Sequence, residues 1–382
     1  MADEAAPRDA TQKPLLLLSE SLRNADMYYA TRFLAGDPFI YLAIPQEPVR
    51  KEVLVVSHME YERARKESRV HDVRSSLDYG TNLKLDEVVI KLLRDEGVTA
   101  VEVPRTFYLG TAEALRMNGI DVVPVEEMLV TKQREIKTDQ EVQYITKAQR
   151  ACEFALEQAL ATIKQARIER DCHLWYNGKV LTAERVRAII EHALLDAGCS
   201  SNGDLPIVSC GKRAADPHYS GHGPLLSDEP IIIDIFPRLK TERYFADMTR
   251  TVVYGEPSPE IAAMYDAVLA AQNAALALVK AGILCRDVHF AVCDLFEERG
   301  YGTIRTGAKS GFIHSTGHGV GLNVHENPSV SDNEYVLQKG NVITIEPGLY
   351  EPNIGGVRLE DLVLVHQNGG ENLTTFAKQL VL

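Results

Sequence analysis

The chain has 382 residues, of which 45% are hydrophobic and 25% are charged, as in an ordinary globular protein that buries a large core without covalent staples. At about 100–200 residues per domain, this length favours two domains. The formal net charge of −13 argues against a nucleic-acid-binding protein, because such a protein needs a basic face to meet phosphate groups.

The N-terminal sequence MADEAAPRDATQKP is polar and acidic, and it lacks the basic and apolar regions of a signal peptide. The leucine run at 15–18 is too short to span a membrane. None of the six cysteines belongs to a C-x-x-C pair, so a thiolate zinc site is not expected and the cysteines should be reduced thiols. We therefore expect a cytoplasmic protein that has neither a membrane nor a nucleic acid as its partner.

The first third of the chain alternates between strand-like and helix-like stretches. Short runs rich in β-branched and aromatic residues predict buried strands at 39–44, 52–58 and 98–103. Apolar side chains at helical spacing predict a helix over 83–96, which Gly97 ends. These elements indicate a small α/β domain over residues 1–133.

Three long helices are predicted in the remainder of the chain. The first begins after Thr138, which opens the T-x-x-E pattern of a capping box, and its apolar residues fall on one face. The second begins at Ser258, with Pro259 in its first turn, and ends at Gly282. The third should span residues 287–299.

Strand-like segments alternate with these helices. They occur at 231–236, 244–254, 342–346 and 357–365. Long helices combined with mostly antiparallel strands indicate an α+β domain over residues 134–382. The stretch 172–185, which contains the only tryptophan, Trp175, interrupts the helical pattern and is interpreted as an insertion of unassigned role.

Each of these strand-like segments contains a carboxylate that a simple strand would not need. An ionised carboxylate in an apolar strand is costly unless it is paired or bound to a metal ion. Any one of them alone could be a strand-end cap, a member of an ion pair or an edge residue. Together with a histidine cluster, the four predict a metal site: Asp234, Asp247, Glu346 and Glu360.

Three histidines lie in the sequence GFIHSTGHGVGLNVHENP, at His314, His318 and His325. The first two are four residues apart, but Ser315 stands where the helical zinc motif of metalloproteases needs a glutamate. The glycines also disfavour a helix. We interpret the segment as a glycine-rich strand and loop that lets backbone and imidazole approach a ligand closely.

The order of these motifs resembles the pita-bread metallopeptidase family, which includes methionine aminopeptidase, aminopeptidase P and prolidase. The motifs are an aspartate, D-x-T-R-T, G-H-G-x-G-L-x-x-H-E, E-P-G-L-Y and R-x-E-D. The resemblance spans residues 134–382 and implies an α+β pita-bread catalytic domain. The segment 24–33, NADMYYATRF, resembles the smaller α/β domain of aminopeptidase P and prolidase.

One feature departs from the family pattern. Asp234 and Asp247 are thirteen positions apart, and the spacing in the family is usually shorter. The additional residues fall in PRLKTERY, which we interpret as a longer hairpin turn that need not move the two strands.

The resemblance implies five ligands for two divalent metal ions. Asp247 and Glu360 would bridge the ions, Asp234 would hold one of them, and His318 with Glu346 would complete the other. A ligand set of oxygens with one imidazole suits Mn²⁺ first, and also Co²⁺, Zn²⁺ or Fe²⁺. A water between two cations ionises near neutral pH, so the implied nucleophile is a metal-bridging hydroxide, with Glu346 as the general base.

The resemblance also implies roles for three further histidines. His325 would stabilise the tetrahedral intermediate, and His314 would lie near the scissile bond, as in the proline-specific members of the family. His218, in the sequence DPHYSGHGP, matches another active-site histidine, and the neighbouring His222 is an alternative for that role.

Arg358 is expected to orient the carboxylates from outside the ligand set. A strand through 357–365 would place Arg358 and Glu360 on one face, because side chains on a strand alternate with a period of two. The alternative for Arg358 and Thr249 is simple packing or ion pairing.

The predicted function is hydrolysis of the bond between an N-terminal residue and proline in short peptides. The N-terminal domain, His314 and the chain length favour an Xaa-Pro dipeptidase or an Xaa-Pro aminopeptidase over a methionine aminopeptidase. A homodimer is expected from the resemblance. The other readings are a metal-free binding module of the same fold and a metal-free enzyme such as creatinase, and metal content distinguishes both from the metallopeptidase.

Overall fold

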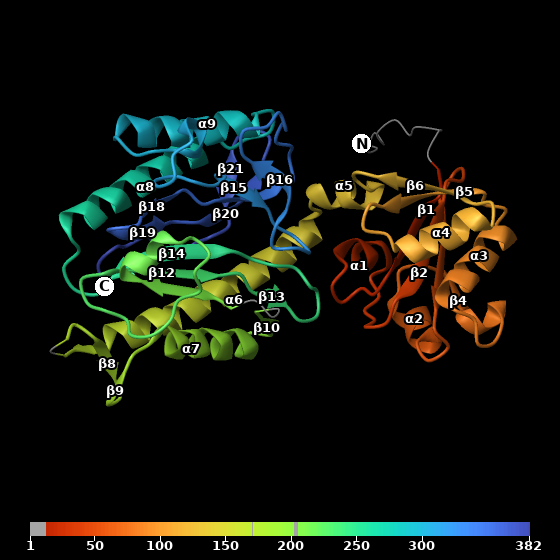
Figure 1. The fold of residues 1–382 in the computed structure, drawn as a ribbon, viewed down its shortest axis with the longest axis horizontal. Coiled ribbons are helices and arrows are strands. Elements are labelled where there is room, and N and C mark those ends of the chain that lie inside the picture. Colours follow the sequence, from red (N-terminus) through yellow and green to blue (C-terminus); the bar gives the residue numbers. More distant parts are fainter. Residues whose placement is uncertain (1–12, 170, 202–204) are drawn as a thin grey trace. The chain divides into compact units, whose positions relative to one another are not determined.

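A computed structural model describes residues 13–169, 171–201 and 205–382 of the chain. The chain divides into two compact units, Met1–Arg134 and Glu135–Leu382, whereas the sequence placed the boundary between residues 133 and 134. Figure 1 labels helices and strands of both units. The acidic residues at 1–12, on which the signal-peptide argument depends, lie outside the described residues.

The N-terminal unit is built on a mixed sheet whose strands follow the order β4-β3-β2-β1-β5-β6. The strands are β1 (Leu15–Ser19), β2 (Phe39–Ile44), β3 (Lys51–Val56), β4 (Asp72–Ser75), β5 (Ala100–Pro104) and β6 (Asp121–Val125). The three strands predicted from the sequence are confirmed, with ends that differ by up to two residues. Apolar clusters cover both faces of the sheet, which explains why its strands are almost continuously apolar.

Helices cover both faces of this sheet (Figure 1). They are α1 (Ala25–Thr31), α2 (Tyr61–Glu67), the 3-10 helix η1 (Ser76–Tyr79), α3 (Leu85–Asp95), α4 (Leu109–Met117) and α5 (Leu129–Glu135). Residues of α1 and α2 belong to one apolar cluster, and residues of α3 and α4 belong to the other. The unit is therefore a three-layered α/β domain, and α3 confirms the predicted helix.

In the C-terminal unit, α6 and α7 lie on one side of the strands and α8 and α9 on the other (Figure 1). These helices are α6 (Asp139–Lys164), α7 (Ala183–Asp196), α8 (Pro259–Leu278) and α9 (Cys285–Glu298). The predicted capping box at Thr138 is confirmed, as is the start of α8 at Ser258 and Pro259. The predicted end of α8 at Gly282 is wrong, because the helix ends at Leu278 and Val279 is already extended.

Helix α8 is long and apolar enough to cross a membrane by length and composition alone. Its apolar residues, however, form the central core of the C-terminal unit with α9 and the adjacent strands. The buried Gln272 also donates hydrogen bonds to two backbone carbonyls of these strands. The helix is therefore built as the core helix of a globular unit.

The strands of the C-terminal unit form antiparallel ladders. One sheet has the order β11-β12-β14, a second has the order β16-β15-β17-β20-β21, and β18 forms a hairpin with β19. Their bounds are β11 (Ile207–Cys210), β12 (Pro230–Ile235), β14 (Met248–Val253), β15 (Gly317–Gly319), β16 (Glu326–Val330), β17 (Val342–Ile345), β18 (Gly348–Glu351), β19 (Gly355–Arg358), β20 (Asp361–Val365) and β21 (Gly370–Asn372). Two further 3-10 helices are η2 (Gly211–Ala215) and η3 (Ile304–Thr306). This arrangement matches the α+β prediction.

Two predicted strands differ from the structure. The segment 357–365 is divided into β19 and β20, because β19 pairs with β18 whereas β20 pairs with β17, and the chain changes partner at Glu360. The segment predicted at 244–254 becomes a strand only at Met248. Asp247, Glu346 and Glu360 therefore lie just outside strands, and Asp234 alone among the four carboxylates lies within one.

The stretch 172–185 contains a small hairpin that precedes α7. Strands β7 (Arg167–Ile168), β8 (Leu174–Tyr176) and β9 (Lys179–Val180) form a short sheet, and β10 (Cys199–Ser200) pairs with β13 (Arg238–Leu239) elsewhere. Asn177 and Gly178 both have positive φ, 52° and 71°, as the two-residue turn of a tight hairpin requires. The interruption seen in the sequence is thus a β-hairpin.

Candidate metal centre

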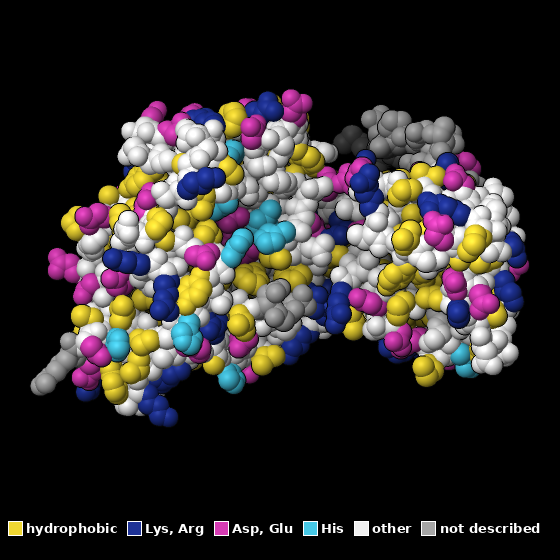
Figure 2. Space-filling view, viewed as in Figure 1, with side chains coloured by type: hydrophobic (Ala, Val, Ile, Leu, Met, Phe, Trp, Pro, Cys, Tyr) yellow, Lys and Arg dark blue, Asp and Glu magenta, His cyan; other side chains and the backbone are white. Residues whose placement is uncertain are grey.

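The five predicted ligands come from segments that lie far apart in the sequence. Asp234 lies in β12 opposite Thr249 of β14, and Asp247 immediately precedes β14. His318 is the middle residue of β15, Glu346 follows β17, and Glu360 lies between β19 and β20. Figure 2 shows histidine side chains gathered in one patch on this face of the unit, with acidic side chains beside them.

His318 lies at the centre of the carboxylate cluster. Its Nε2 atom is 3.7 Å from Asp247 Oδ2, 3.4 Å from Glu346 Oε1 and 4.0 Å from Glu360 Oε1. The ligand atoms of Asp247, His318 and Glu360 all lie within 4.8 Å of one another. The structure thus brings four of the five predicted ligands together around one imidazole nitrogen.

The hydrogen bonds of His318 define which of its nitrogens carries the proton. Nδ1 lies 3.2 Å from the carbonyl oxygen of Gly319, which can only accept, so Nδ1 is the N–H donor. Burial, and then the neighbouring His325, lower the pKa of His318 to about 3, so the ring is neutral. Its Nε2 lone pair therefore faces three carboxylates, an arrangement that is repulsive without a cation between them.

The carboxylates themselves also favour the binding of a positive charge. Burial and the charges of neighbouring acids raise the pKa values of Asp247 and Glu360 well above their ordinary values. Asp234 Oδ1 and Asp247 Oδ1 are buried without a hydrogen-bond partner among the described residues. Buried acceptors without donors are costly, and a divalent cation can bind several such oxygen atoms at once. The donor set of this cluster therefore fits divalent metal ions.

Arg358 is held within the site by three side chains. Its Nη2 donates to Asp234 Oδ2 at 2.6 Å, its Nε donates to Thr249 Oγ1 at 3.1 Å and its Nη1 donates to Tyr350 OH at 2.8 Å. The Thr249 hydroxyl in turn donates to Glu360 Oε2 at 2.8 Å. Arg358 thus reaches Asp234 directly and Glu360 through Thr249. The predicted strand face shared by Arg358 and Glu360 is wrong, since Glu360 lies outside β19.

Both ring nitrogens of His314 have partners in this arrangement. Nδ1 donates to the Ser315 carbonyl oxygen at 2.7 Å, so Nε2 accepts from Tyr350 OH at 3.0 Å. Tyr350 OH can donate in this direction because its oxygen accepts from Arg358. Burial, and then the charge of Arg358, lower the pKa of His314 to about 4, which keeps the ring neutral. Tyr350 was not predicted, although it is the last residue of the E-P-G-L-Y motif.

The remaining predicted histidines differ in position. The rings of His325 and His318 meet edge to face, with centroids 4.3 Å apart. His218 lies close enough to both His314 and His325 to lower their pKa values. His222 instead pairs through Nδ1 with Glu184 at 2.7 Å, and its side chain is 77% exposed. The structure therefore favours His218 over His222 as the histidine of the site.

Close backbone packing explains the glycines around His318. A Cβ atom at Gly317 would lie 1.9 Å from the carbonyl oxygen of Thr344, and one at Gly319 would lie 2.2 Å from that of Asn327. Only glycine permits β15 to run this close to its two neighbouring strands. The His318 backbone N–H also donates to Thr344 Oγ1 at 3.1 Å, which fixes the imidazole beside Glu346.

Gln272 is a further residue of the site that the sequence did not reveal. From α8, its Nε2 donates to the carbonyl oxygens of Ile345 at 2.9 Å and Leu359 at 3.1 Å. These are the residues that immediately precede Glu346 and Glu360. The available signal was a fully buried amide in an otherwise apolar helix, and its contacts depend on the tertiary fold.

Without metal, the ionisation of Glu346 is expected to lower the stability of the C-terminal unit as the pH rises from about 4.5 to about 8. Burial, and then the charge of Asp234, raise the pKa of Glu346 from 4.5 to about 8 against the opposing charge of Arg358. A carboxyl group with a raised folded-state pKa contributes stability that is complete below its unfolded pKa and is lost as the pH passes the folded pKa. Thermal unfolding of chelator-treated protein between about pH 5 and pH 8 measures this effect.

The Glu346→Gln variant is the control for this pH dependence, because an amide at this position cannot ionise. It should show a smaller loss of stability across the same pH range. Equal changes of stability with pH in the wild-type protein and in this variant would contradict the raised pKa of Glu346.

Comparisons with known proteins agree with the chemistry of this site. The model of metallopeptidase family M24 matches residues 143–367. The chain is 31% identical over 364 residues to a Xaa-Pro dipeptidase from Pyrococcus horikoshii, covering 94% of this chain and 93% of that protein. Its structure is similar to a Xaa-Pro dipeptidase from Bacillus anthracis, with a TM-score of 0.82 and 27% identity over 97% and 95% of the two chains. It is also similar to an X-Pro aminopeptidase from Thermotoga maritima, with a TM-score of 0.79 and 26% identity over 97% of each chain.

Proposed function

The chain belongs to metallopeptidase family M24, and we propose that it is a metal-dependent exopeptidase that hydrolyses the bond between an N-terminal residue and proline. The observation that carries the proposal is the neutral His318 Nε2 atom among Asp247, Glu346 and Glu360. We assign the C-terminal unit to the pita-bread fold and propose that these residues, with Asp234, hold two divalent metal ions. Manganese suits this oxygen-rich set, as do cobalt, zinc and iron.

The metal ions, when bound, would supply Lewis-acid stabilisation of the negative charge that develops on the substrate carbonyl oxygen. The protein supplies the proton transfers and the orientation. Glu346 is the carboxyl group that we assign to carrying a proton to the leaving nitrogen of proline. His325 is neutral near pH 7 because burial lowers its pKa, so its N–H can donate to a developing oxyanion.

His314 is assigned an orienting role rather than proton transfer. Both of its ring nitrogens have partners, and they connect it through Tyr350 to Arg358. Arg358 in turn holds Asp234 at 2.6 Å. This chain of hydrogen bonds fixes one wall of the site beside the carboxylates.

We propose a dipeptidase in preference to an aminopeptidase, on the strength of the Xaa-Pro dipeptidase from Pyrococcus horikoshii that matches nearly the whole chain. The substrates would be short peptides with proline at the second position. We also propose a homodimer in the cytoplasm. All six cysteines are free thiols, which supports a reducing compartment, and light scattering of the purified protein tests the dimer.

Hydrolysis of three peptides, Ala-Pro, Ala-Pro-Ala and Met-Ala-Ala, tests the proposal in chelator and then with added Mn²⁺. We expect metal-dependent cleavage of Ala-Pro alone. Cleavage of Ala-Pro-Ala would identify an Xaa-Pro aminopeptidase, and cleavage of Met-Ala-Ala alone would overturn the proline specificity. Failure to cleave any of the three peptides, with Mn²⁺ or with Co²⁺, Zn²⁺ or Fe²⁺ in its place, would favour a binding module.

A further inference from the structure

We propose that Arg250, Asp361 and the C-terminal segment Asn372–Lys378 form a positioning network for Glu360. Glu360 lies between β19 and β20, so no strand ladder holds its backbone. A ligand in an irregular segment needs other contacts to keep its carboxylate in place, because side-chain geometry follows from backbone geometry. This inference rests on the proposed metal centre and does not depend on the choice of peptide substrate.

Arg250 has a hydrogen-bond partner for every N–H of its guanidinium group. A guanidinium has five such donors, and Arg250 is only 2% exposed. The five acceptors are Thr249 O at 2.9 Å, Glu360 O at 2.7 Å, Asp361 Oδ1 at 2.8 Å, Phe376 O at 2.7 Å and Ala377 O at 3.2 Å. One planar group therefore joins β14, the Glu360 segment and the C-terminal segment.

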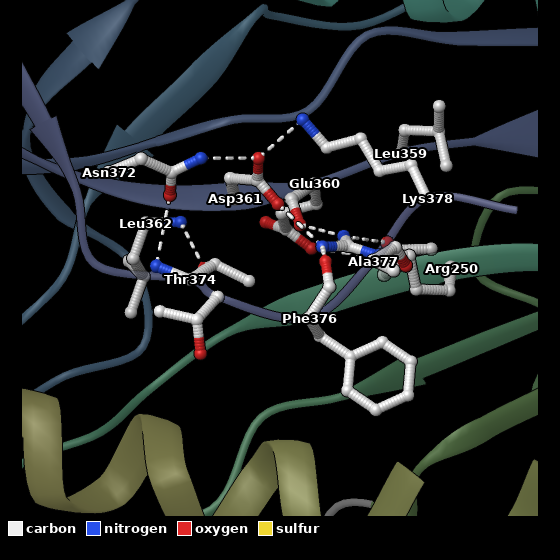
Figure 3. A network of polar contacts seen from close by, with 12 residues as sticks. Arg250, Leu359, Glu360, Asp361, Leu362, Asn372, Thr374, Phe376, Ala377 and Lys378 are labelled. Atoms are coloured by element: carbon white, nitrogen blue, oxygen red, sulfur yellow. Dashed lines mark hydrogen bonds and ion pairs between the residues drawn. The ribbon is translucent and has the colours of Figure 1, made fainter. Parts of the chain in front are cut away.

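Asp361 provides the opposite half of this network, as Figure 3 shows. It is fully buried, and its Oδ1 accepts from Arg250. Its Oδ2 accepts from Asn372 Nδ2 at 2.7 Å and from Lys378 Nζ at 2.6 Å. Asp361 directly follows Glu360 in the chain. Its carboxylate thus binds both ends of the C-terminal segment, at Asn372 and at Lys378.

These contacts fix Glu360 from its backbone outward. Its N–H donates to Thr249 O at 3.1 Å, and its carbonyl oxygen accepts from Arg250. Its Oε2 accepts from Thr249 Oγ1, whereas Oε1 is the oxygen that faces His318 at 4.0 Å. Loss of the Arg250 fork would release the carbonyl oxygen of Glu360 and the C-terminal segment together, and the orientation of Oε1 would no longer be fixed.

After Asn372, which ends β21, the C-terminal segment has no regular structure. Residues 373–380 lie outside helices and strands, and backbone hydrogen bonds join Val253 of β14 to Leu380 and Leu382 at the end of the chain. A second arginine, Arg150 of α6, also holds this segment. It donates to Leu373 O at 2.7 Å and to Thr375 Oγ1 at 2.6 Å, and no contact joins it to Glu360 among the described residues.

The matched variants Arg250→Lys and Arg150→Lys separate positioning from simple anchoring of the segment. Lysine keeps the charge in each case but cannot reproduce the planar fork of the guanidinium. Mn²⁺ is titrated calorimetrically into each metal-free, full-length protein. Arg250→Lys should weaken Mn²⁺ binding by about 10–100-fold, the usual effect of losing a contact that orients a ligand. Arg150→Lys should bind Mn²⁺ as the wild type does.

Thermal unfolding with and without Mn²⁺ provides the readout that a merely structural role would not change. A structural loss lowers both midpoints equally, whereas a positioning loss reduces the increase that Mn²⁺ produces. Wild-type affinity in Arg250→Lys, or equal weakening in both variants, would overturn the inference. If Arg250→Lys does not fold, Lys378→Met replaces it, and unchanged Mn²⁺ affinity in that variant overturns the inference equally. A wild-type protein that binds no metal would instead refute the proposed function.

Discussion

Glu360→Gln is expected to abolish metal binding and peptide hydrolysis while leaving the metal-free protein at least as stable as the wild type. The amide keeps the shape of the side chain and can still accept the hydrogen bond from Thr249, so packing is preserved. It removes one of the mutually repelling carboxylates, whose burial and shared charge raise their pKa values. The loss of metal affinity should exceed the roughly 10–100-fold cost of losing an outer contact, because a ligand itself is lost.

The metal content of the purified protein measures the loss of metal binding, and thermal unfolding in chelator measures the stability of the metal-free protein. Asp247→Asn should behave in the same way, since its carboxylate also faces His318. Asp332→Asn is the control, because it makes the same acid-to-amide change at an exposed residue that pairs with Arg286. A Glu360→Gln enzyme with full metal content and turnover would exclude the dinuclear assignment. A metal-free Glu360→Gln protein that is markedly less stable than the wild type would show that the carboxylates do not repel one another.

The sequence predicted the elements whose signals are local. The strand at 39–44 and the capping box at Thr138 depend on a few neighbouring residues, and the structure contains both. The division of 357–365 depends instead on β19 and β20 having different partners. No local pattern encodes a change of partner, so an apolar alternating run was interpreted as one strand.

The site was predictable in its chemistry and not in its supporting contacts. Four carboxylates and a glycine-flanked His318 are visible as residue types, and the structure gathers three of these carboxylates around the Nε2 atom of His318. Tyr350, Gln272 and Arg250 support these ligands across separations of many residues, as between Arg250 and Phe376. A sequence shows that such residues are present, but only the fold shows which backbone groups they reach.

Lys137→Met is expected to destabilise the C-terminal unit by about 3–5 kcal/mol, the usual cost of removing one partner of a buried ion pair. Lys137 Nζ lies 2.7 Å from Glu326 Oε1, and the two side chains are 1% and 8% exposed. Lys137 immediately precedes the cap of α6, and Glu326 immediately follows His325. Methionine preserves most of the length and apolar surface of lysine, so the loss should come mainly from the removal of the Lys137 charge beside the buried Glu326 carboxylate.

Urea unfolding followed by tryptophan fluorescence measures this loss for the C-terminal unit, since Trp175 is the only tryptophan in the chain. Lys147→Met is the matched control. Lys147 pairs with Glu242 at 2.8 Å, but its side chain is 58% exposed, so the change should cost no more than about 1 kcal/mol. Equal losses in the two variants would contradict the importance of burial.

The double variant Lys137→Met/Glu326→Gln shows whether Lys137 stabilises the unit by balancing the charge of Glu326 or independently of Glu326. If most of the cost comes from the Glu326 charge losing the buried Lys137 cation, neutralising Glu326 should restore much of the stability that Lys137→Met loses. The amide can still accept from the backbone N–H of Asn323, which donates to Glu326 Oε2 at 3.3 Å. Additive losses would mean that the two residues act independently. Recovery of stability in the double variant would show that the opposite charges of Lys137 and Glu326 hold the segment after His325 in place. That segment adjoins His325, whose ring packs against His318.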